Sequence, residues 1–87
     1  MERTFHLTVI TPERLVLDEA VSALVAPGSM GSLGVLANHA PLITTLVPGR
    51  LSITAAHGAR STFMIGAGFL DVRHNEAILL TQSLTAA

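Results

Sequence analysis

The sequence predicts an all-β fold, a single flattened β-sandwich or barrel of about eight to ten short strands. Apolar and polar residues alternate with a period of two in several short runs, as they do in half-buried strands. Glycine, proline and asparagine separate these runs at regular intervals and provide residues suited to turns. A chain of 87 residues is long enough for one domain, so we expect residues 1–87 to form a single unit.

The first predicted strand covers residues 4–10, where Phe5, Leu7 and Val9 fall on one face. The next segment, residues 12–26, is ambiguous. Some of its apolar residues have helical spacing and others repeat at every second position, while its valines favour a strand. The residues alone leave both structures open.

Further short strands are expected along the rest of the chain, separated by turn residues. They are predicted at about residues 33–37, 42–46, 50–55, 61–65, 69–73 and 77–81. The segment Gly66-Ala67-Gly68 interrupts two of them, as a bulge or corner would. Residues 82–87 have no alternating pattern, and we expect this tail to fray.

A core built from alternating residues would take leucine, valine, isoleucine and phenylalanine side chains from nearly all strands. Its expected members are Leu7, Val9, Val21, Val25, Leu33, Leu42, Leu46, Leu51, Ile53, Phe63, Ile65, Phe69, Val72, Ile78 and Leu80. Phe69 follows the Gly68 corner and is expected to be a buried anchor of this core.

The composition limits the classes of function. The net charge is −1 and the five cationic residues are dispersed arginines, which argues against nucleic-acid binding. No run approaches the ~18 apolar residues of a membrane helix, and the N-terminus lacks the apolar region of a signal peptide, so we expect no direct membrane insertion. Apolar residues make up 49% and charged residues only 13%, which favours an apolar contact surface.

No group of residues indicates catalysis. The four histidines are scattered, and His39 has no histidine or carboxylate two or four positions away. The segment 66–68 lacks the third glycine, the lysine and the following helix of a phosphate-binding loop. Asp18 and Glu19 would point to opposite faces of a strand, which prevents paired acid–base chemistry. We therefore expect no catalytic residue, no cofactor and no metal.

One stretch, residues 31–49, has an unusual order: Gly31-Ser32-Leu33-Gly34, then Asn38-His39-Ala40-Pro41-Leu42, then Pro48-Gly49. Together with Thr11-Pro12-Glu13 and Gly68-Phe69, this order closely resembles the ε subunit of F-type ATP synthase. The resemblance covers about Phe5 to Thr81. It implies the N-terminal β-sandwich of that family, with two consecutive strands in residues 12–26 and a bend between them at Asp18-Glu19.

The resemblance also implies partners and a site. It implies a non-catalytic subunit of the rotor that joins the γ subunit to the polar loops of the membrane c-ring, contacts the rest of F1 through γ, and couples proton-driven rotation to ATP synthesis. The implied location is peripheral, at the cytoplasmic face of the bacterial inner membrane. The implied c-ring edge consists of Gly31, Ser32, Leu33, Asn38, His39, Ala40, Pro41 and Leu42, and structural roles fall to Pro48, Gly49, Gly68 and Phe69. Ser32 stands where many members carry an acidic residue, so a charge is replaced by a hydroxyl.

Members of the family typically continue into a helical hairpin that can block rotation and, in some members, binds ATP. No helical periodicity follows residue 81 here, so we expect the coupling role without helix-dependent inhibition or nucleotide binding. The alternative is an independent β module that binds a small ligand or a carbohydrate. Such a module needs exposed aromatic residues around a concave site, and the chain has three phenylalanines but no tryptophan or tyrosine.

Overall fold

The computed structural model describes residues 3–87, which form nine strands and no helix. The strands are β1 (Phe5–Ile10), β2 (Leu15–Gly28), β3 (Gly31–Leu36), β4 (Leu42–Leu46), β5 (Gly49–Ala55), β6 (Arg60–Ile65), β7 (Gly68–Arg73), β8 (Glu76–Thr81) and β9 (Leu84–Ala86). The all-β prediction is confirmed. Within residues 3–87 there is thus no helix long and apolar enough to cross a membrane.

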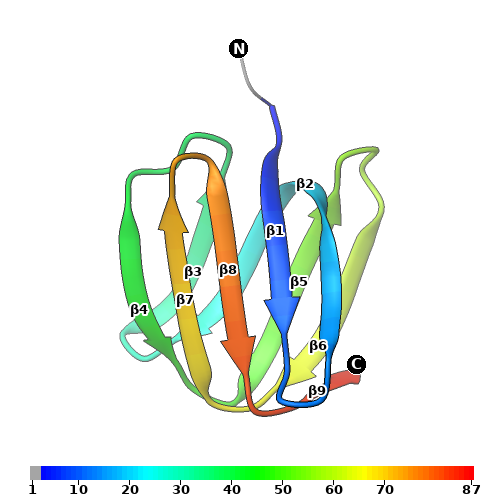
Figure 1. The fold of residues 1–87 in the computed structure, drawn as a ribbon, viewed down its shortest axis with the longest axis vertical. Coiled ribbons are helices and arrows are strands. Elements are labelled where there is room, and N and C mark those ends of the chain that lie inside the picture. Colours follow the sequence, from blue (N-terminus) through cyan, green and yellow to red (C-terminus); the bar gives the residue numbers. More distant parts are fainter. Residues whose placement is uncertain (1–2) are drawn as a thin grey trace.

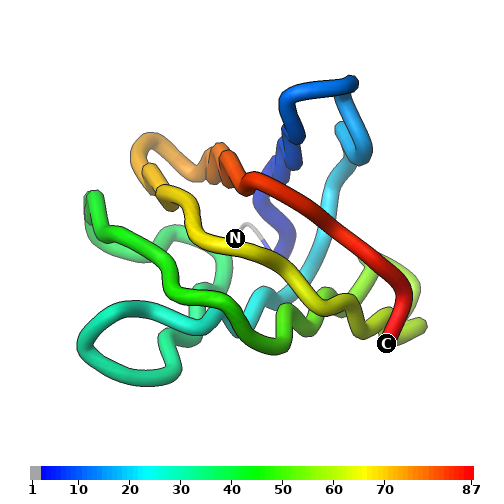
Figure 2. Tube along the Cα trace, turned by 90° about the horizontal axis from the view of Figure 1, so that it is seen from below, coloured from blue at the N-terminus to red at the C-terminus, as the bar shows by residue number. Residues whose placement is uncertain are grey.

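The strands form two layers that pack face to face (Figures 1 and 2). One layer has the order β1-β8-β7-β4, and the other contains β3, β2, β5, β6 and β9. The long strand β2 joins them, because its first half pairs with β1 and its second half with β3 and β5. Neighbouring strands are antiparallel except for β1 and β8, which run parallel. The buried apolar side chains lie between the layers and form one core.

The segment that the pattern left open is one continuous strand, so the expected pair of strands with a bend at Asp18-Glu19 is wrong. Both acidic residues stay in the ladder with β1, opposite Thr8 and Leu7. β2 has one register shift opposite Val9 and Ile10 of β1 and another at Ser22, where β2 leaves β1 for β5 and one residue has no cross-strand partner. The Ser22 hydroxyl donates to the carbonyl oxygens of Thr54 and Ala55, at 3.3 and 3.2 Å, and so fixes this bulge.

The bulge at Ser22 also explains why Val25 was wrongly placed in the core. An extra residue reverses the side-chain alternation, since successive residues of a strand point to opposite faces. Val21 is buried before the bulge, whereas Leu24 and Ala26 are buried after it and Val25 is exposed.

The core placements of Phe69, Ile78 and Leu80 are also wrong. In β7 and β8 the buried residues are Leu70, Val72, Ala77 and Leu79, and the three predicted residues lie on the outer face. Phe69 is 55% exposed and is therefore no core anchor. Among the other predicted residues, Leu33, Leu42 and Phe63 are partly buried against the core, and the rest are buried.

The tail does not fray as expected. Residues Leu84–Ala86 form β9, which pairs antiparallel with the end of β6. The red C-terminal segment in Figure 2 crosses the end of the sandwich from β8 to the other layer. The amide of Gly66 donates to the Ser83 carbonyl and the Thr81 hydroxyl donates to the Gly66 carbonyl, both at 3.1 Å, which holds this crossing in place.

Candidate interaction surfaces

The first candidate surface is a lateral edge of the sandwich made by β3 and β4. β4 lies at this side of one layer and β3 at the same side of the other layer (Figures 1 and 2). Among the described residues β3 pairs only with β2, so one side of its backbone faces outward with unpaired donors and acceptors. No aspartate, glutamate, lysine or arginine occurs from residue 20 to residue 49, which includes all of β3 and β4. This edge therefore offers backbone hydrogen bonding and apolar contact without charge.

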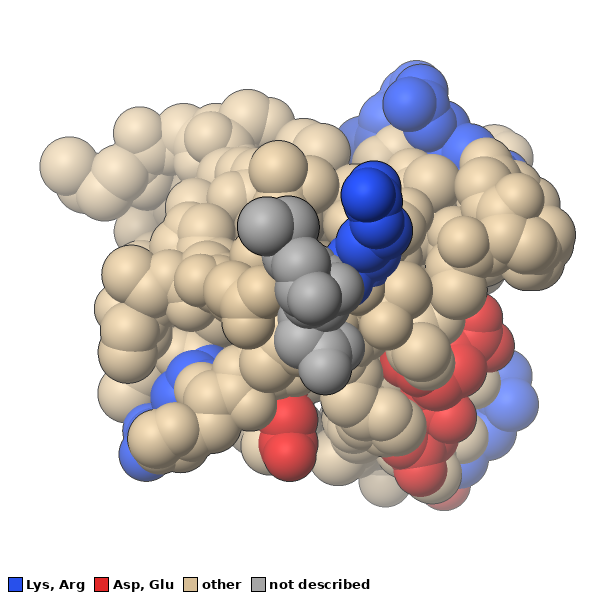
Figure 3. Space-filling model, turned by 90° about the horizontal axis from the view of Figure 1, so that it is seen from above, with Lys and Arg blue, Asp and Glu red and all other residues tan. Residues whose placement is uncertain are grey.

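Large apolar side chains are exposed along this edge. Met30 in the β2–β3 turn is 97% exposed, Leu36 at the end of β3 is 64% exposed, and Ile43 in β4 is 66% exposed. Figure 3 views the molecule from above. Most of its red acidic side chains gather at the lower right and one red group lies apart at the bottom, while the left side of the view is mostly tan with one blue group. An uncharged edge of this kind is typical of a protein contact surface.

The residues predicted for the c-ring edge all lie along this lateral edge, but in two groups. Gly31, Ser32 and Leu33 begin β3, whereas the loop from Asn38 to Pro41 follows its other end and Leu42 opens β4. Ser32, Asn38, Ala40 and Pro41 are exposed, while Leu33, His39 and Leu42 are partly buried. Any partner that touches both groups must therefore extend along the whole of β3.

His39 is held by its own loop. Its backbone amide donates to the Leu36 carbonyl at 3.2 Å, and its Nδ1 lies 2.7 Å from the Ala40 carbonyl oxygen. A carbonyl oxygen only accepts, so Nδ1 carries the proton in this contact. In the neutral ring the opposite nitrogen, Nε2, then remains an acceptor for a donor on a partner. The contact fixes the orientation of the ring as well as its tautomer.

The predicted structural pair Pro48-Gly49 lies against Pro27. A side chain at Gly49 would place its Cβ 2.9 Å from the Pro27 Cβ, too close for an undistorted contact. The amide of Val47 donates to the Pro27 carbonyl at 2.9 Å. These contacts hold the β4–β5 connection against the end of β2.

The second candidate surface is the outer face of the layer β1-β8-β7-β4. Cross-strand neighbours on this face form two rows, Thr45–Phe69–Leu80–Ile10 and Ile43–Asp71–Ile78–Thr8. The first row is apolar except for a threonine hydroxyl. In the second row the Asp71 carboxylate is paired with Arg73 through two contacts of 3.0 and 3.1 Å. A contiguous apolar patch across four strands is typical of an interaction site rather than of ordinary surface.

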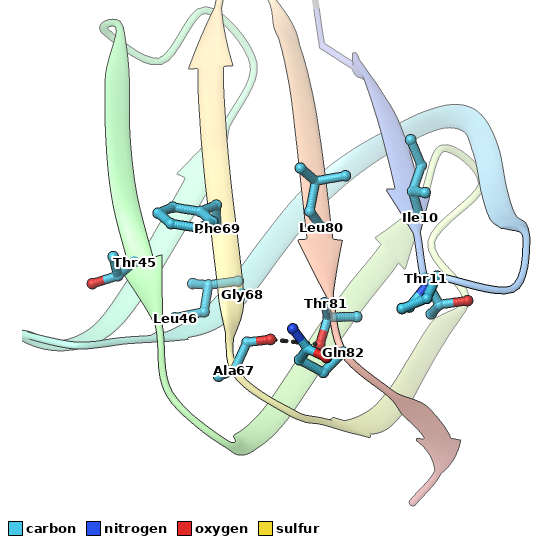
Figure 4. Close-up of a pocket in the computed structure, with 11 residues that line it drawn as sticks. Ile10, Thr11, Thr45, Leu46, Ala67, Gly68, Phe69, Leu80, Thr81 and Gln82 are labelled. Atoms are coloured by element: carbon cyan, nitrogen blue, oxygen red, sulfur yellow. Dashed lines mark hydrogen bonds between the residues drawn. The ribbon is translucent and has the colours of Figure 1, made fainter.

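A groove of about 580 Å³ lies at one end of this face, with Ile10, Phe69 and Leu80 among the side chains that line it (Figure 4). Its threonine hydroxyls already have partners, since Thr45 donates to the Ser29 hydroxyl and Thr81 to the Gly66 carbonyl. The volume would suit a small ligand, but a ligand site also needs several free polar groups that converge on it, and here the side-chain amide of Gln82 stands alone. The groove fits an apolar side chain of a partner better.

The described residues hold no cluster of three or more histidine, aspartate or glutamate side chains able to bind a metal ion. His6 contacts Asp18 on an exposed part of β1 and β2, and the other three histidines lie in separate loops. The described residues 3–87 therefore offer surfaces suited to binding, and among them there is no recognisable catalytic group.

The pattern analysis missed the second surface and one further residue. The apolar outer face had a detectable sign, because β7 and β8 are apolar at successive positions and not only at alternate ones. Asn75, in the β7–β8 turn, contacts the Asn38 loop although it is 37 positions away. Nothing in the local sequence indicates that contact.

Comparison with known proteins gives a consistent result. A family model described as "ATP synthase, Delta/Epsilon chain, beta-sandwich domain" matches residues 4–87. The ATP synthase epsilon chain of Brucella anthropi is 38% identical over 85 residues, which cover 98% of this chain and 63% of the relative. That of Rhizobium etli is 37% identical over 83 residues, covering 95% and 62%. The chain thus spans somewhat less than two-thirds of the length of these relatives.

Two solved structures share the fold. A chain in the cryo-EM structure of the Euglena gracilis mitochondrial ATP synthase, OSCP/F1/c-ring in rotational state 1, matches with a TM-score of 0.93 and 25% identity, over 99% of this chain and 55% of that one. A chain in the central stalk/c-ring structure of the Tetrahymena thermophila mitochondrial ATP synthase matches with a TM-score of 0.81 and 21% identity, over 93% and 65%.

Proposed function

The chain belongs to the delta/epsilon family of ATP synthase chains, through their β-sandwich domain, and from this membership we propose that it is a non-catalytic rotor subunit joining γ to the c-ring. The observation that carries the proposal is that an uncharged strand edge and an apolar sheet face meet along β4. We assign the edge formed by β3 and β4 to the polar loops of the c-ring. We assign the outer face of β1-β8-β7-β4 to γ.

The arrangement suits transmission of torque. Ile43 of β4 belongs both to the lateral edge and to the outer face, so the two contacts are joined by one strand. β4 is paired over its whole length with β7, and β7 with β8. A force applied at the edge would pass to the outer face through continuous hydrogen-bonded ladders instead of a flexible loop. The subunit would then act as a rigid connection, and catalysis would occur in other subunits.

The apolar outer face supports γ as a permanent partner. Stable interfaces contain a buried apolar centre with few charges, and the row Thr45–Phe69–Leu80–Ile10 has that character. The proposed location follows from the proposed partners: peripheral to the membrane, on its cytoplasmic face in a bacterium. A ligand-binding module gains little support, because the three threonine hydroxyls of the groove are already bonded and a single side-chain amide, that of Gln82, is left to meet a ligand.

Replacement of His39 by glutamate is expected to weaken assembly with the c-ring about tenfold, since it would place an unpaired carboxylate in an uncharged contact. The measurement is ATP-driven proton pumping by reconstituted ATP synthase as the concentration of the chain is varied. His57→Glu is the matched control, because His57 lies in the exposed β5–β6 connection, away from this edge. Equal pumping with His39→Glu and the wild-type chain would contradict the c-ring assignment.

Replacement of Phe69 by aspartate is expected to weaken binding to γ at least about 30-fold, equivalent to about 2 kcal/mol, because a central aromatic contact becomes a buried charge. Calorimetric titration of γ with the purified chain would measure this. Val25→Asp is the control, since Val25 is an exposed apolar strand residue on the opposite layer. If the Val25 variant lost as much affinity as the Phe69 variant, γ would have been assigned to the wrong face.

A further inference from the structure

The loop between β3 and β4 has a conformation that needs external support. It carries the chain from one layer to the other within residues 37–41. Asn38 has a φ of 63°, in the left-handed region, which asparagine adopts more readily than most residues but still seldom. The only backbone bond within the loop runs from the His39 amide to the Leu36 carbonyl. The loop contributes four of the eight residues assigned to the c-ring edge, so its conformation determines what that edge presents.

Asn75 supplies the missing support from the β7–β8 turn. Its side-chain oxygen Oδ1 accepts a hydrogen bond of 2.7 Å from the Asn38 amide. Its Nδ2 donates to the Thr4 carbonyl at 2.9 Å, and its own carbonyl accepts from the His6 amide at 3.2 Å. A backbone amide only donates and a carbonyl only accepts, so the chemistry of the two partners fixes which end of the side chain faces which. One residue thereby joins the loop, the turn and the start of β1.

The turn is built to present this side chain. His74 and Asn75 have φ values of 51° and 60°, and Arg73 pairs with Glu76, as in a two-residue hairpin of type I′. Asparagine tolerates this conformation better than most residues do. Figure 1 shows the β7–β8 turn and the β3–β4 loop at the same end of the sandwich. The tight turn thus holds Asn75 in the position from which its side chain contacts the β3–β4 loop.

We propose that Asn75 is a positioning residue that holds the Asn38–His39 loop in the conformation required for docking to the c-ring. The proposal rests on the proposed function, because it gives Asn75 a role through His39. A loop already held in its bound conformation loses less conformational entropy when it binds. The Asn75 side chain fixes the position of the Asn38 amide, and Asn38 immediately precedes His39 in the loop. The contact between His39 Nδ1 and the Ala40 carbonyl oxygen then fixes the orientation of the ring.

The test uses Asn75→Gly in the full chain bound to γ. Glycine adopts a φ of 60° without strain, so the turn is kept and only the two side-chain hydrogen bonds are lost. The matched control is His74→Gly, which makes the same change of backbone freedom at the neighbouring turn position but leaves Asn75 in place. Asn75→Asp is a second variant: it keeps the acceptor for Asn38 and puts an oxygen against the Thr4 carbonyl.

Two measurements are needed. Hydrogen exchange of the Asn38 amide, followed by NMR, is expected to become at least about tenfold faster in Asn75→Gly and to stay unchanged in His74→Gly. Affinity for detergent-solubilised c-rings is expected to fall roughly 3–10-fold in Asn75→Gly. In a His39→Ala background the same substitution should cause a smaller loss, because the loop then has no ring to position and only its other residues still benefit from being held.

The outcomes separate this inference from the proposed function. If His39→Glu weakens c-ring binding and Asn75→Gly does not, the positioning role is wrong while the c-ring assignment stands. If neither substitution weakens binding, the c-ring assignment fails and the positioning role fails with it. An equal loss from Asn75→Gly with and without the His39 ring would also overturn the role as proposed, since Asn75 would then act independently of His39. Unchanged exchange of the Asn38 amide would overturn it as well.

Discussion

Replacing Leu70 by alanine is expected to lower the free energy of unfolding by about 2–5 kcal/mol. Leu70 is fully buried in β7 and belongs to the single core between the layers. The substitution removes buried apolar groups and leaves a cavity that the two layers cannot fully close. A domain of this size has a total stability of roughly 4–13 kcal/mol, so the loss is a large part of it. Urea denaturation followed by circular dichroism would measure the difference.

Phe69→Ala is the control for this experiment, and it tests the register of β7 directly. Phe69 is the preceding residue and is larger than leucine, yet its side chain lies on the outer face. We expect its replacement to change the free energy of unfolding by less than about 1 kcal/mol. If Phe69→Ala were the more destabilising of the two, the side chains of β7 would point the other way and the apolar outer face would not exist.

The sequence pattern does not show which side chains of β7 and β8 point into the core. Alternation assigns a face only when one set of residues is polar, and here Phe69, Leu70, Ile78 and Leu79 are all apolar. The choice is made by strand pairing: Leu70 lies opposite Leu79, both turned inward, and Phe69 lies opposite Leu80, both turned outward. The same ambiguity that caused the wrong core placements indicates that this layer has apolar residues on both sides.

The misplacement of Val25 has a different cause. Apolar residues alternate regularly in the sequence of residues 15–25, and this alternation gives no sign of a one-residue bulge. The bulge forms where β2 changes partners, and its Ser22 hydroxyl is bonded to residues more than 30 positions away. Local sequence does not contain that information. The bend at Asp18-Glu19 was implied by the resemblance, and it is wrong because both residues stay in the ladder with β1.

The candidate site was predictable only in part. The glycine and proline positions between residues 31 and 49, together with the resemblance, predict a contact edge, and these residues do lie along β3, the loop after it and the start of β4; their contact with the c-ring stays a prediction. The division of that edge into two groups at opposite ends of β3 follows from the length of the strand, which the pattern placed two residues too late. The contact between Asn75 and the Asn38 amide arises from the packing of the two layers, so local sequence motifs do not predict it.

The close approach of β7 and β8 at Gly68 leads to the second large effect on stability. A Cβ at Gly68 would lie 1.8 Å from the Leu80 carbonyl oxygen and 2.9 Å from the Thr81 Cα. Both are backbone atoms of the neighbouring strand, so no side-chain rotation can relieve the clash. Gly68 also pairs with Leu46 on its other side, which prevents β7 from shifting away without breaking the ladder with β4.

Gly68→Ala is therefore expected to cost at least about 3 kcal/mol, the upper end of the usual range for overpacking, because backbone must move. For a domain of this length, such a loss lowers the melting temperature by roughly 12–24 °C.

Gly34→Ala is the matched control. A Cβ at Gly34 meets no atom within 4 Å, and β3 lies at the edge of its layer. That substitution should leave stability unchanged or raise it by up to about 1 kcal/mol, since it restricts the unfolded chain. Thermal melts of both variants, recorded side by side with the wild-type chain, would decide the matter. Equal melting temperatures for Gly68→Ala and Gly34→Ala would mean that the two strands do not approach each other as closely at Gly68 as described, and that the corner before β7 tolerates a side chain.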